Sequence, residues 1–454
     1  MSDIFAILQF CLGYKENISN VVARIDWQEL YSFASKQAIL GLCFDGIERL
    51  GKEYPEELKK YPIERDLLMT WMGVSQQIRR QNMMVNAVAS KLYSMLREDG
   101  LRCCILKGQG NALIYPNAHS RNPGDIDVWV NASREEITEY AKRHLNLEDD
   151  IRFHHLETTM DGVPVELHFF PCSMNNPLYN ARLQKWFKRN ADLQCSNVVS
   201  LPDGIGEIAI PTTAFNVIYQ LTHLYHHFFD EGIGMRQIID YFLVVNDFSK
   251  NVFLNNKSSK ITPSLFTLKE GSTSHPDPLS LRGEGGNRPT RYSEPLRSKD
   301  GGASKPSPNC AGWDRRGVSG DIASDASVSS AFTTDSSAST ALDVVQRELE
   351  YLGLWKFAGA VMYVLHEVLG LPEEKMIAPM DEKRGRLLLA EILNGGNFGK
   401  HFTKYGHFTQ QGMAKKYFLK IWRNMHFVRY YPAEALSEPI FRTWHFFWRM
   451  KNKK

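Results

Sequence analysis

The sequence predicts an α+β protein in which a small mixed β-sheet core is embedded between N-terminal helices and a C-terminal helical domain. Three observations predict this fold class. Residues 1–99 place apolar side chains at helical spacing, residues 100–170 contain short apolar or alternating segments typical of strands, and helical spacing returns from residue 212. The chain of 454 residues is 43% hydrophobic and 23% charged, which is enough apolar material for two or three cores.

Helical spacing is clearest in two N-terminal segments. They read WQELYSFASKQAILGLCFDGIERL and RDLLMTWMGVSQQIRRQNMMVNAVASKLYSMLRE, and Asp99-Gly100 marks the end of the second. These helices make up the first predicted region, residues 1–99.

The next region, residues 100–211, begins with the predicted strands LRCCIL, DIDVWV and VPVELHFF. A helix is expected directly after the second strand, because Ser133 and Glu136 have the spacing of a capping box. The predicted order is strand, short helix, strand, helix, strand. The segment RFHHLETTMDGVPVELHFF is expected to form a hairpin that turns at Asp161-Gly162.

The rest of the chain divides by composition. Residues 212–250 return to helical spacing, with a break at Gly232-Ile233-Gly234. Residues 251–340 are rich in Ser, Gly, Pro and Asp and show no period, so they bury too little apolar surface to offset the entropy of ordering. We predict a disordered low-complexity insert there. Residues 341–454 resume the helical pattern as the second part of the same domain and end in a basic, aromatic tail.

Bulk features argue against several classes of protein. The net charge is only +3, which gives no strong preference for nucleic acid or membrane, and the seven cysteines show neither zinc-knuckle spacing nor a disulfide framework. The N-terminus lacks a basic leader, and the most apolar helical stretch carries Lys356, His366 and Glu367. We therefore expect no membrane span and a cytoplasmic location.

Two acidic residues open the second predicted strand. Asp125 and Asp127 share one face, because side chains two residues apart in a strand point the same way. Like charges about 6–7 Å apart in a partly buried place repel each other and are costly to desolvate. A divalent cation such as Mg²⁺ or Mn²⁺ removes both penalties. The alternative is an exposed strand start with two solvated acids.

Residues before and after this strand favour the metal site. Glu166 is a charged residue inside an otherwise apolar strand and would complete a site of three carboxylates if its strand lies beside the second one. Lys107-Gly108 ends the first strand where a helix begins, and such a turn allows close approach of an anion such as a polyphosphate.

The ordered set LKG, YP, Arg121, DIDVWV and ELH resembles the bacterial group of mostly uncharacterised nucleotidyltransferases within the polymerase-β-like nucleotidyltransferase superfamily. Members of that group carry a His-rich helix after the core, followed by Arg and Asp. This chain has LTHLYHHFFDEGIGMRQIIDYF there. The resemblance covers residues 85–250 best, and it implies that residues 100–211 form a nucleotidyltransferase core.

The resemblance also implies roles for individual residues. Asp125 and Asp127 would hold metal ions, and Glu166 would complete the metal site and orient or deprotonate an acceptor hydroxyl. Nucleotide binding would involve Lys107, Gly108, Gln109 and Arg121. The superfamily usually has Gly-Ser or Gly-Gly at the first turn, whereas Gly108 is followed here by Gln109. Lys107 would then supply the phosphate contact, and a degenerate enzyme remains an alternative.

Four residues of the His-rich region are candidate acceptor or phosphate contacts: His223, His227, Arg236 and Asp240. His223 and His227 have the spacing of a zinc pair, but ordinary packing and a substrate-facing patch are alternatives. Arg236 and Asp240 could instead pair with each other on the helix. The basic, aromatic tail is expected to be an amphipathic packing helix, with nucleic-acid or membrane contact as the alternative.

The predicted reaction is transfer of a nucleoside monophosphate from a Mg²⁺-bound nucleoside triphosphate to an acceptor hydroxyl, with release of pyrophosphate. One alternative is a catalytically weak nucleotide-binding or regulatory module, and another is an RNA-binding nucleotidyltransferase that uses the basic tail. The acceptor, which could be a small molecule, a sugar, a protein or RNA, is left open by the sequence, as are the base and the oligomeric state.

Overall fold

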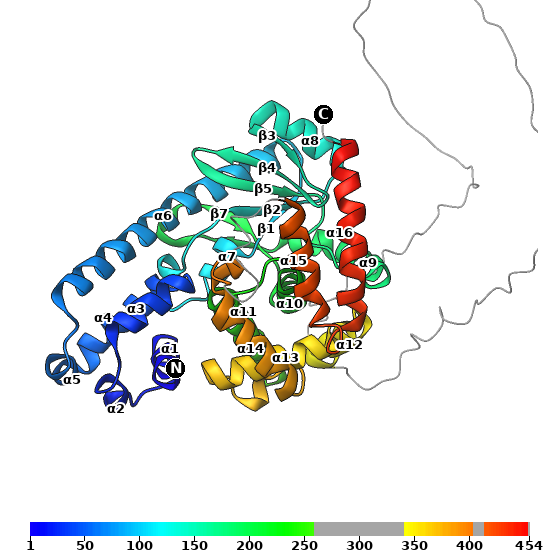
Figure 1. Cartoon of the computed structure of the whole chain (residues 1–454). Helices are drawn as coiled ribbons and strands as arrows, with labels where there is room; N and C mark the ends of the chain where they lie inside the picture. The colour runs from blue at the N-terminus through cyan, green and yellow to red at the C-terminus, as the bar shows by residue number, and fades with distance from the viewer. Residues whose placement is uncertain (258–339, 403–412, 453–454) are drawn as a thin grey trace, which may run out of the picture. The chain divides into compact units, whose positions relative to one another are not determined.

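A computed structural model describes residues 1–257, 340–402 and 413–452 of the chain, and their fold is α+β, as predicted. Its main sheet has five strands in the order β1-β2-β5-β4-β3 (Figure 1). The strands are β1 (Cys103–Leu106), β2 (Ile126–Val130), β3 (Asn146–Ile151), β4 (His155–Met160) and β5 (Val163–His168). The sheet is mixed, because β2 and β5 are parallel whereas the other neighbours are antiparallel.

The side chains of strand β2 point alternately to the two faces of this sheet. Ile126, Val128 and Val130 share a core with α6 (Arg65–Glu98) and α8 (Arg134–His144). The opposite face carries Asp127 and Trp129, and the Trp129 ring stacks on Phe215 of α10 (Thr213–Asp230). The alternation predicted from the sequence is confirmed, and it places Asp127 between the sheet and the helices that follow it.

The local turns around the sheet form where the sequence predicts them. Strands β4 and β5 form a hairpin that turns at Asp161 and Gly162, whose φ angles of 50° and 79° suit the left-handed turns that match strand twist. Helix α7 (Gly108–Ala112) follows β1 directly. Ser133 and Glu136 form both hydrogen bonds of a capping box at the start of α8.

The last of the N-terminal helices is α6. Gly100 follows it with a φ of 77°, a left-handed conformation that ends helices, and the chain then enters β1. They are α1 (Ser2–Cys11), α2 (Ser19–Val22), α3 (Trp27–Lys36), α4 (Leu40–Glu53), α5 (Pro55–Lys60) and α6.

Elements after the sheet include three that the sequence did not predict: α9 (Pro177–Ser196), β6 (Val198–Ser200) and β7 (Glu207–Ala209). The break at Gly232-Ile233-Gly234 is confirmed, because α10 ends at Asp230 and α11 begins at Met235. The remaining helices are α11 (Met235–Lys257), α12 (Ala341–Tyr351), α13 (Trp355–Leu369), α14 (Glu382–Gly395), α15 (Met413–Met425) and α16 (Pro432–Asn452).

The predicted start of the insert at residue 251 is wrong, because residues 251–257 are helical. Helix α11 continues through residues 251–257 as far as Lys257, and the remainder, residues 258–339, lies outside the described residues. Thr340 then caps α12 with its side chain. Helices from the two sides of the insert pack together, α10 against α12 and α11 against α13.

This packing leads to a prediction about the insert. Replacement of residues 258–339 by a flexible Gly/Ser linker is expected to change the free energy of unfolding by less than about 1 kcal/mol, because loop length enters loop-closure entropy only logarithmically. Urea unfolding followed by circular dichroism measures this change. Loss of the cooperative transition would show instead that the insert is part of the folded core.

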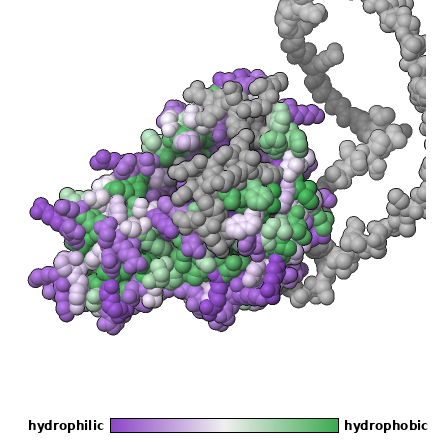
Figure 2. All heavy atoms as spheres, in the orientation of Figure 1, coloured by the Kyte–Doolittle hydropathy of each residue, from purple (hydrophilic) through white to green (hydrophobic). Residues whose placement is uncertain are grey.

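Helix α16 has apolar residues both on the face that packs against the rest of the described structure and on a face exposed to solvent. The ring of Phe153, just before β4, packs edge-on against Trp444 and Trp448. Ile440 and Phe447 are exposed, at 73% and 62%, and Figure 2 shows hydrophobic residues gathered along this helix. The helix therefore packs, as expected, but keeps an exposed apolar face. In the described part of the chain, no helix has the length and apolar character needed to cross a bilayer.

Candidate active site

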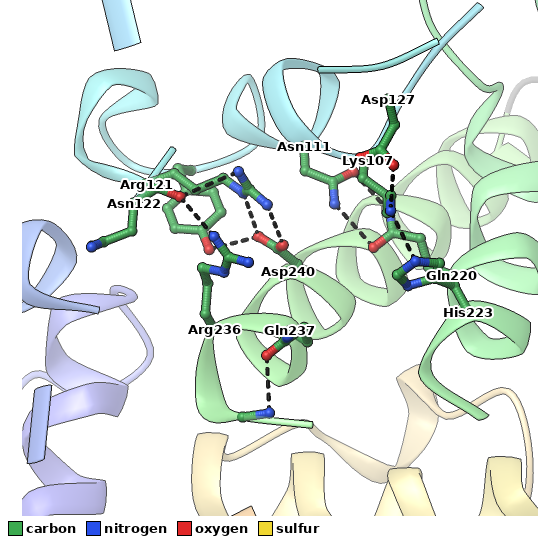
Figure 3. Close-up of polar contacts among 12 residues, drawn as sticks. Lys107, Asn111, Arg121, Asn122, Asp127, Gln220, His223, Arg236, Gln237 and Asp240 are labelled. Atoms are coloured by element: carbon green, nitrogen blue, oxygen red, sulfur yellow. Dashed lines mark hydrogen bonds and ion pairs between the residues drawn. The ribbon is translucent and has the colours of Figure 1, made fainter. Parts of the chain in front are cut away.

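A pocket lies where the start of β2, the turn after β1 and helices α10 and α11 meet (Figure 3). Eight of the predicted site residues line it: Lys107, Gly108, Arg121, Asp125, Asp127, His223, Arg236 and Asp240. Other lining residues include Gln220, Gln237 and Phe398. These side chains come from positions far apart in the sequence, so the fold gathers most of the predicted set into one place.

The acidic side of the pocket is built on two neighbouring strands. Asp127 of β2 and Glu166 of β5 are directly opposite each other in the parallel register, as expected if Glu166 lies beside the acidic pair. Asp127 is only 4% exposed, and Glu166 is half-buried next to it. Glu166 is outside the set that lines the pocket, but His168 links it to Asp127.

His168 lies between these two carboxylates. Its Nε2 is 3.0 Å from Oδ1 of Asp127 and 3.2 Å from Oε2 of Glu166. Burial alone would lower the pKa of His168, but the two carboxylates overcome this effect and raise the pKa to about 9. The imidazole is therefore charged at neutral pH, and it compensates part of the negative charge.

Lys107 provides the second compensating charge. Its Nζ lies 2.9 Å from Oδ1 of Asp127. Burial lowers the pKa of Lys107, but Asp127 and Asp125 more than offset this and raise it. Burial likewise raises the pKa of Asp127, but Lys107 and His168 hold it well below its usual range. Asp127 is thus a carboxylate at any physiological pH.

Asp125 stands exposed at the mouth of the pocket. The pKa of Asp125 is raised to about 6, and the largest cause is the negative charge of Asp127. Partial loss of water around the Asp125 carboxyl group is the second cause. Such like-charge repulsion is what a bound cation would relieve.

The backbone at Lys107 adopts an uncommon conformation, with a φ of 50° for a side chain that is not glycine. Such conformations cost roughly 1–3 kcal/mol and persist where the surrounding structure enforces them. This one turns the chain from β1 into α7 and directs the ammonium group at Asp127.

Lys107 also reaches the His-rich helix. Its Nζ lies 2.8 Å from Nε2 of His223, and Nε2 of His227 lies 3.0 Å from the same atom. Burial and the nearby Lys107 hold the pKa of His223 well below its usual range, so this imidazole is neutral and its Nε2 accepts a hydrogen bond. The two histidines therefore bond to each other, which does not favour the zinc-pair alternative.

The basic side of the pocket is formed by two arginines around one carboxylate (Figure 3). Arg121 binds Asp240 with two hydrogen bonds of 2.9 and 2.8 Å, and Tyr115 donates a third of 2.7 Å. The guanidinium group of Arg121, which the resemblance implies in nucleotide binding, thus makes a bidentate contact with Asp240 in this structure. The predicted Arg236–Asp240 pair is likewise replaced by Arg121–Asp240.

Arg236 is left with few partners. Its Nη1 donates to the carbonyl oxygen of Asn122 at 3.2 Å, and its guanidinium lies over the Phe398 ring. Its buried Nε has no hydrogen-bond partner among the described residues. Arg121 and Arg236 therefore bring two positive charges to this wall of the pocket, and Asp240 brings one negative charge. The wall keeps an excess positive charge.

Gln109 differs from the other predicted residues. Its side chain is 3% exposed, donates to Oδ1 of Asn86 on α6 and is not part of the pocket lining. A direct side-chain contact of Gln109 with a nucleotide is therefore not supported. Gly108, in contrast, lines the pocket with a φ of 34°, which glycine adopts more easily than other residues.

The buried position of Gln109 leads to a prediction. Gln109→Ala is expected to lower the free energy of unfolding by about 1–3 kcal/mol, because the amide of Asn86 loses its buried partner. Nucleotide affinity, measured by calorimetry, should change less than about twofold, because the Gln109 side chain does not line the pocket and its loss should alter the binding free energy by less than RT. A tenfold loss of affinity without destabilisation would place Gln109 in the nucleotide site after all.

The main residue missed by the sequence analysis is His168. Strand alternation already placed it on the same face as Glu166, yet the sequence contained no signal that it would lie between two carboxylates. That position depends on the pairing of β2 with β5. Asn111 and Gln220 were missed as well; they hydrogen-bond to each other and join α7 to α10.

The donor atoms are suited to a divalent cation. Asp127 and Glu166 each offer a carboxylate oxygen, and these oxygens lie within 4.8 Å of each other. Asp125 adds a further carboxylate at the mouth of the pocket. Oxygen ligands of this kind are those that Mg²⁺ and Mn²⁺ prefer.

Comparison with known protein families places this chain in one of them. Residues 23–262, more than half of the chain, match the model of a family described as uncharacterised nucleotidyltransferase. The match includes every site residue predicted from the sequence, whereas Phe398 lies beyond it. No curated protein and no solved structure matches the chain at a significant level. The chain therefore belongs to the family of uncharacterised nucleotidyltransferases.

Proposed function

We propose that the chain is a metal-dependent enzyme that transfers a nucleoside monophosphate from a nucleoside triphosphate to an acceptor hydroxyl. The family supports nucleotidyl transfer in general. The substrate, the metal and the acceptor type are proposed from the pocket.

One observation carries this proposal: the pocket has two walls of opposite charge. Asp125, Asp127 and the adjoining Glu166 form the acidic wall, and Arg121 with Arg236 forms the basic wall. A complex of a divalent cation with a triphosphate needs both, because carboxylates hold the cation and guanidinium groups bind phosphate oxygens. Arg236 adds a buried Nε that has no hydrogen-bond partner among the described residues and could donate to a phosphate oxygen.

The reaction joins the acceptor oxygen to the α-phosphorus and breaks the bond between that phosphorus and the bridging oxygen, so pyrophosphate leaves. The proton of the acceptor hydroxyl passes to the Glu166 carboxylate. A bound Mg²⁺ or Mn²⁺ supplies neutralisation of charge on the attacking and leaving oxygens. Arg236 and Lys107 bind the phosphates, and Asp127 and Asp125 hold the cation.

Glu166 has a separate role toward the acceptor. Burial raises the pKa of Glu166, but the hydrogen bond with His168 and the charge of that ring lower it below its usual range. It is therefore a carboxylate at neutral pH, able to orient the acceptor hydroxyl and to accept a hydrogen bond from it.

The direct test uses the four nucleoside triphosphates, each labelled at the α-phosphate. The purified chain is incubated with each of them, Mg²⁺ or Mn²⁺ and a cell extract. Label is expected to move to one class of acceptor, and Asp125→Ala combined with Asp127→Ala should abolish the transfer. Undiminished transfer by the double variant would contradict the assigned site.

The same test separates the alternative functions. Binding of the Mg²⁺–nucleotide complex with no transfer to any fraction would favour a nucleotide-binding or regulatory module. The ion pairs that already satisfy Asp127 are compatible with that alternative. Affinity for RNA that falls steeply with salt would favour an RNA-binding enzyme.

Arg236 gives a further prediction. Arg236→Met is expected to raise KM for the triphosphate by about 10–100-fold, because a charge-assisted hydrogen bond contributes roughly 1.5–3 kcal/mol. Arg236→Lys should recover part of that loss, and steady-state kinetics measures both. The control is Arg143→Met, on the exposed face of α8, which should leave KM unchanged. Equal KM values for the Arg236 variants and the wild type would exclude a phosphate contact.

A further inference from the structure

A cluster of histidines lies behind the acidic wall, on the side away from the pocket lining. His154 and His155 come from the bend before β4 and from its first residue, and His168 ends β5 opposite His155 in the antiparallel register. The ring centroids are 4.2 Å apart for His154 and His155, 5.1 Å for His155 and His168, and 5.6 Å for His154 and His168. One ligand atom from each ring lies within 4.8 Å of the others.

We propose that His154, His155 and His168 bind a transition-metal ion of the zinc class, at a site distinct from the carboxylate site for Mg²⁺ or Mn²⁺. Neutral imidazole is a preferred ligand of Zn²⁺ and a poor one for Mg²⁺. Three histidines with a remaining open position form one of the known zinc ligand sets. The site goes beyond nucleotidyl transfer and does not depend on it.

Unpartnered ring nitrogens are the first support. Nδ1 of His168 and both ring nitrogens of His155 are buried and have no hydrogen-bond partner among the described residues. Each side chain is only 3% exposed. An unsatisfied buried polar atom costs roughly 1–3 kcal/mol, so a cluster of them calls for a ligand.

The orientation of His168 is the second support. Its Nε2 faces Asp127 and Glu166, so the ion would bind Nδ1 and replace the proton that this nitrogen carries in the charged ring, with release of that proton to solvent. Histidines that bind metals commonly donate their other ring N–H to a carboxylate, which fixes the ring and makes it a better ligand. With an ion on Nδ1, His168 would still donate to both carboxylates, so the ion would hold the acidic wall in place.

The geometry needs only a small adjustment. Zinc–nitrogen bonds of about 2.0–2.1 Å in a tetrahedron set ligand nitrogens about 3.4 Å apart. His154 precedes the regular part of β4, and rotation of its side chain can bring its ring nitrogen closer to those of His155 and His168. His154 also lines a separate cavity of about 340 Å³ with Ser173 and His226, and this cavity offers the ion a route from solvent.

Another donor set shares His155. Glu157 and Glu166 also have oxygens near its ring, at 3.6 and 3.4 Å. Glu157, however, pairs with Arg152 at 2.5 Å, so its charge is already compensated. The histidine set consists of imidazole nitrogens, which zinc prefers to a carboxylate that is already paired with an arginine, and we therefore assign the ion to it.

The test is metal binding by the full-length chain, independent of any activity. The protein is stripped with a chelator and titrated with Zn²⁺ against a chromophoric competitor in excess Mg²⁺, and with Co²⁺ by visible absorption. One ion per chain is expected, with the Co²⁺ bands of imidazole ligands. His154→Ala and His155→Ala should each weaken binding by at least about 10-fold.

Control variants separate this site from the carboxylates. Asp125→Asn and Glu157→Gln should keep zinc affinity within about twofold, since neither supplies a ligand. Zn²⁺ should also raise the melting temperature of the wild type but not that of His154→Ala, whose half-buried position makes correct folding easy to retain. No retained zinc, unchanged affinity in both histidine variants, or a loss in Glu157→Gln equal to theirs would each overturn the proposal.

Discussion

Asp127→Asn is expected to lower kcat/KM for nucleotidyl transfer by about 10³-fold or more. Metal-assisted neutralisation of charge is worth several kcal/mol in the transition state, and each 1.36 kcal/mol corresponds to a tenfold change in rate. The asparagine has nearly the same shape but lacks the negative charge that holds a cation. Steady-state release of pyrophosphate measures the effect.

Two further variants make this result interpretable. Asp127 also anchors Lys107 and His168, so its loss leaves two cations with fewer partners and can lower stability. Asp125→Asn, at the exposed mouth of the pocket, should reduce transfer with little effect on the unfolding midpoint. Asp161→Asn in the exposed β4–β5 turn is the matched control, because asparagine tolerates the positive φ there.

The outcome decides between an active enzyme and a binding module. If Asp127→Asn retains more than about a tenth of wild-type transfer, the carboxylates do not hold a catalytic ion. If the wild type binds the triphosphate but neither it nor the variants transfer label, the site is a nucleotide-binding one.

Local rules account for what the sequence predicted correctly. Asp161 and Gly162 determine the turn that they form, and Ser133 and Glu136 determine where a helix begins. Alternation in β2 places Asp127 on the face of the sheet opposite to Ile126, Val128 and Val130. Each of these depends on residues within a few positions of one another. The sequence stated only as a condition that the strand of Glu166 lies beside that of Asp127, and it did not predict that the two strands are parallel.

Long-range partners account for what was missed. Arg121 and Asp240 are 119 positions apart, and Gln109 meets Asn86 across 23. No spacing rule connects such residues, because tertiary packing alone decides which polar groups share a buried space. The sequence therefore predicted eight residues that line the pocket, but not which of them pair with each other.

The Arg121–Asp240 pair is expected to give the largest effect on stability. Both side chains are 6% exposed, so Arg121→Ala leaves a buried carboxylate whose remaining hydrogen bond, among the described residues, comes from Tyr115. Breaking a buried pair by removal of one partner costs about 3–5 kcal/mol in the free energy of unfolding. Urea unfolding at pH 7 measures this, and Arg143→Ala, which removes an exposed pair with Glu139, should cost less than about 1 kcal/mol.

A double-variant cycle and the pH dependence show whether the cost arises from the pair itself. Arg121→Ala combined with Asp240→Ala should cost less than the sum of the single changes, because no charge is then left buried alone. Burial raises the pKa of Asp240, but Arg121 lowers it below its usual range. The stabilisation from the pair is therefore present above the unfolded pKa near 3.8 and is lost as pH falls through the lower folded value. Wild type and Arg121→Ala should converge in stability at acid pH; a constant difference would mean that Arg121 stabilises the fold by packing, and that its charge is available to a phosphate.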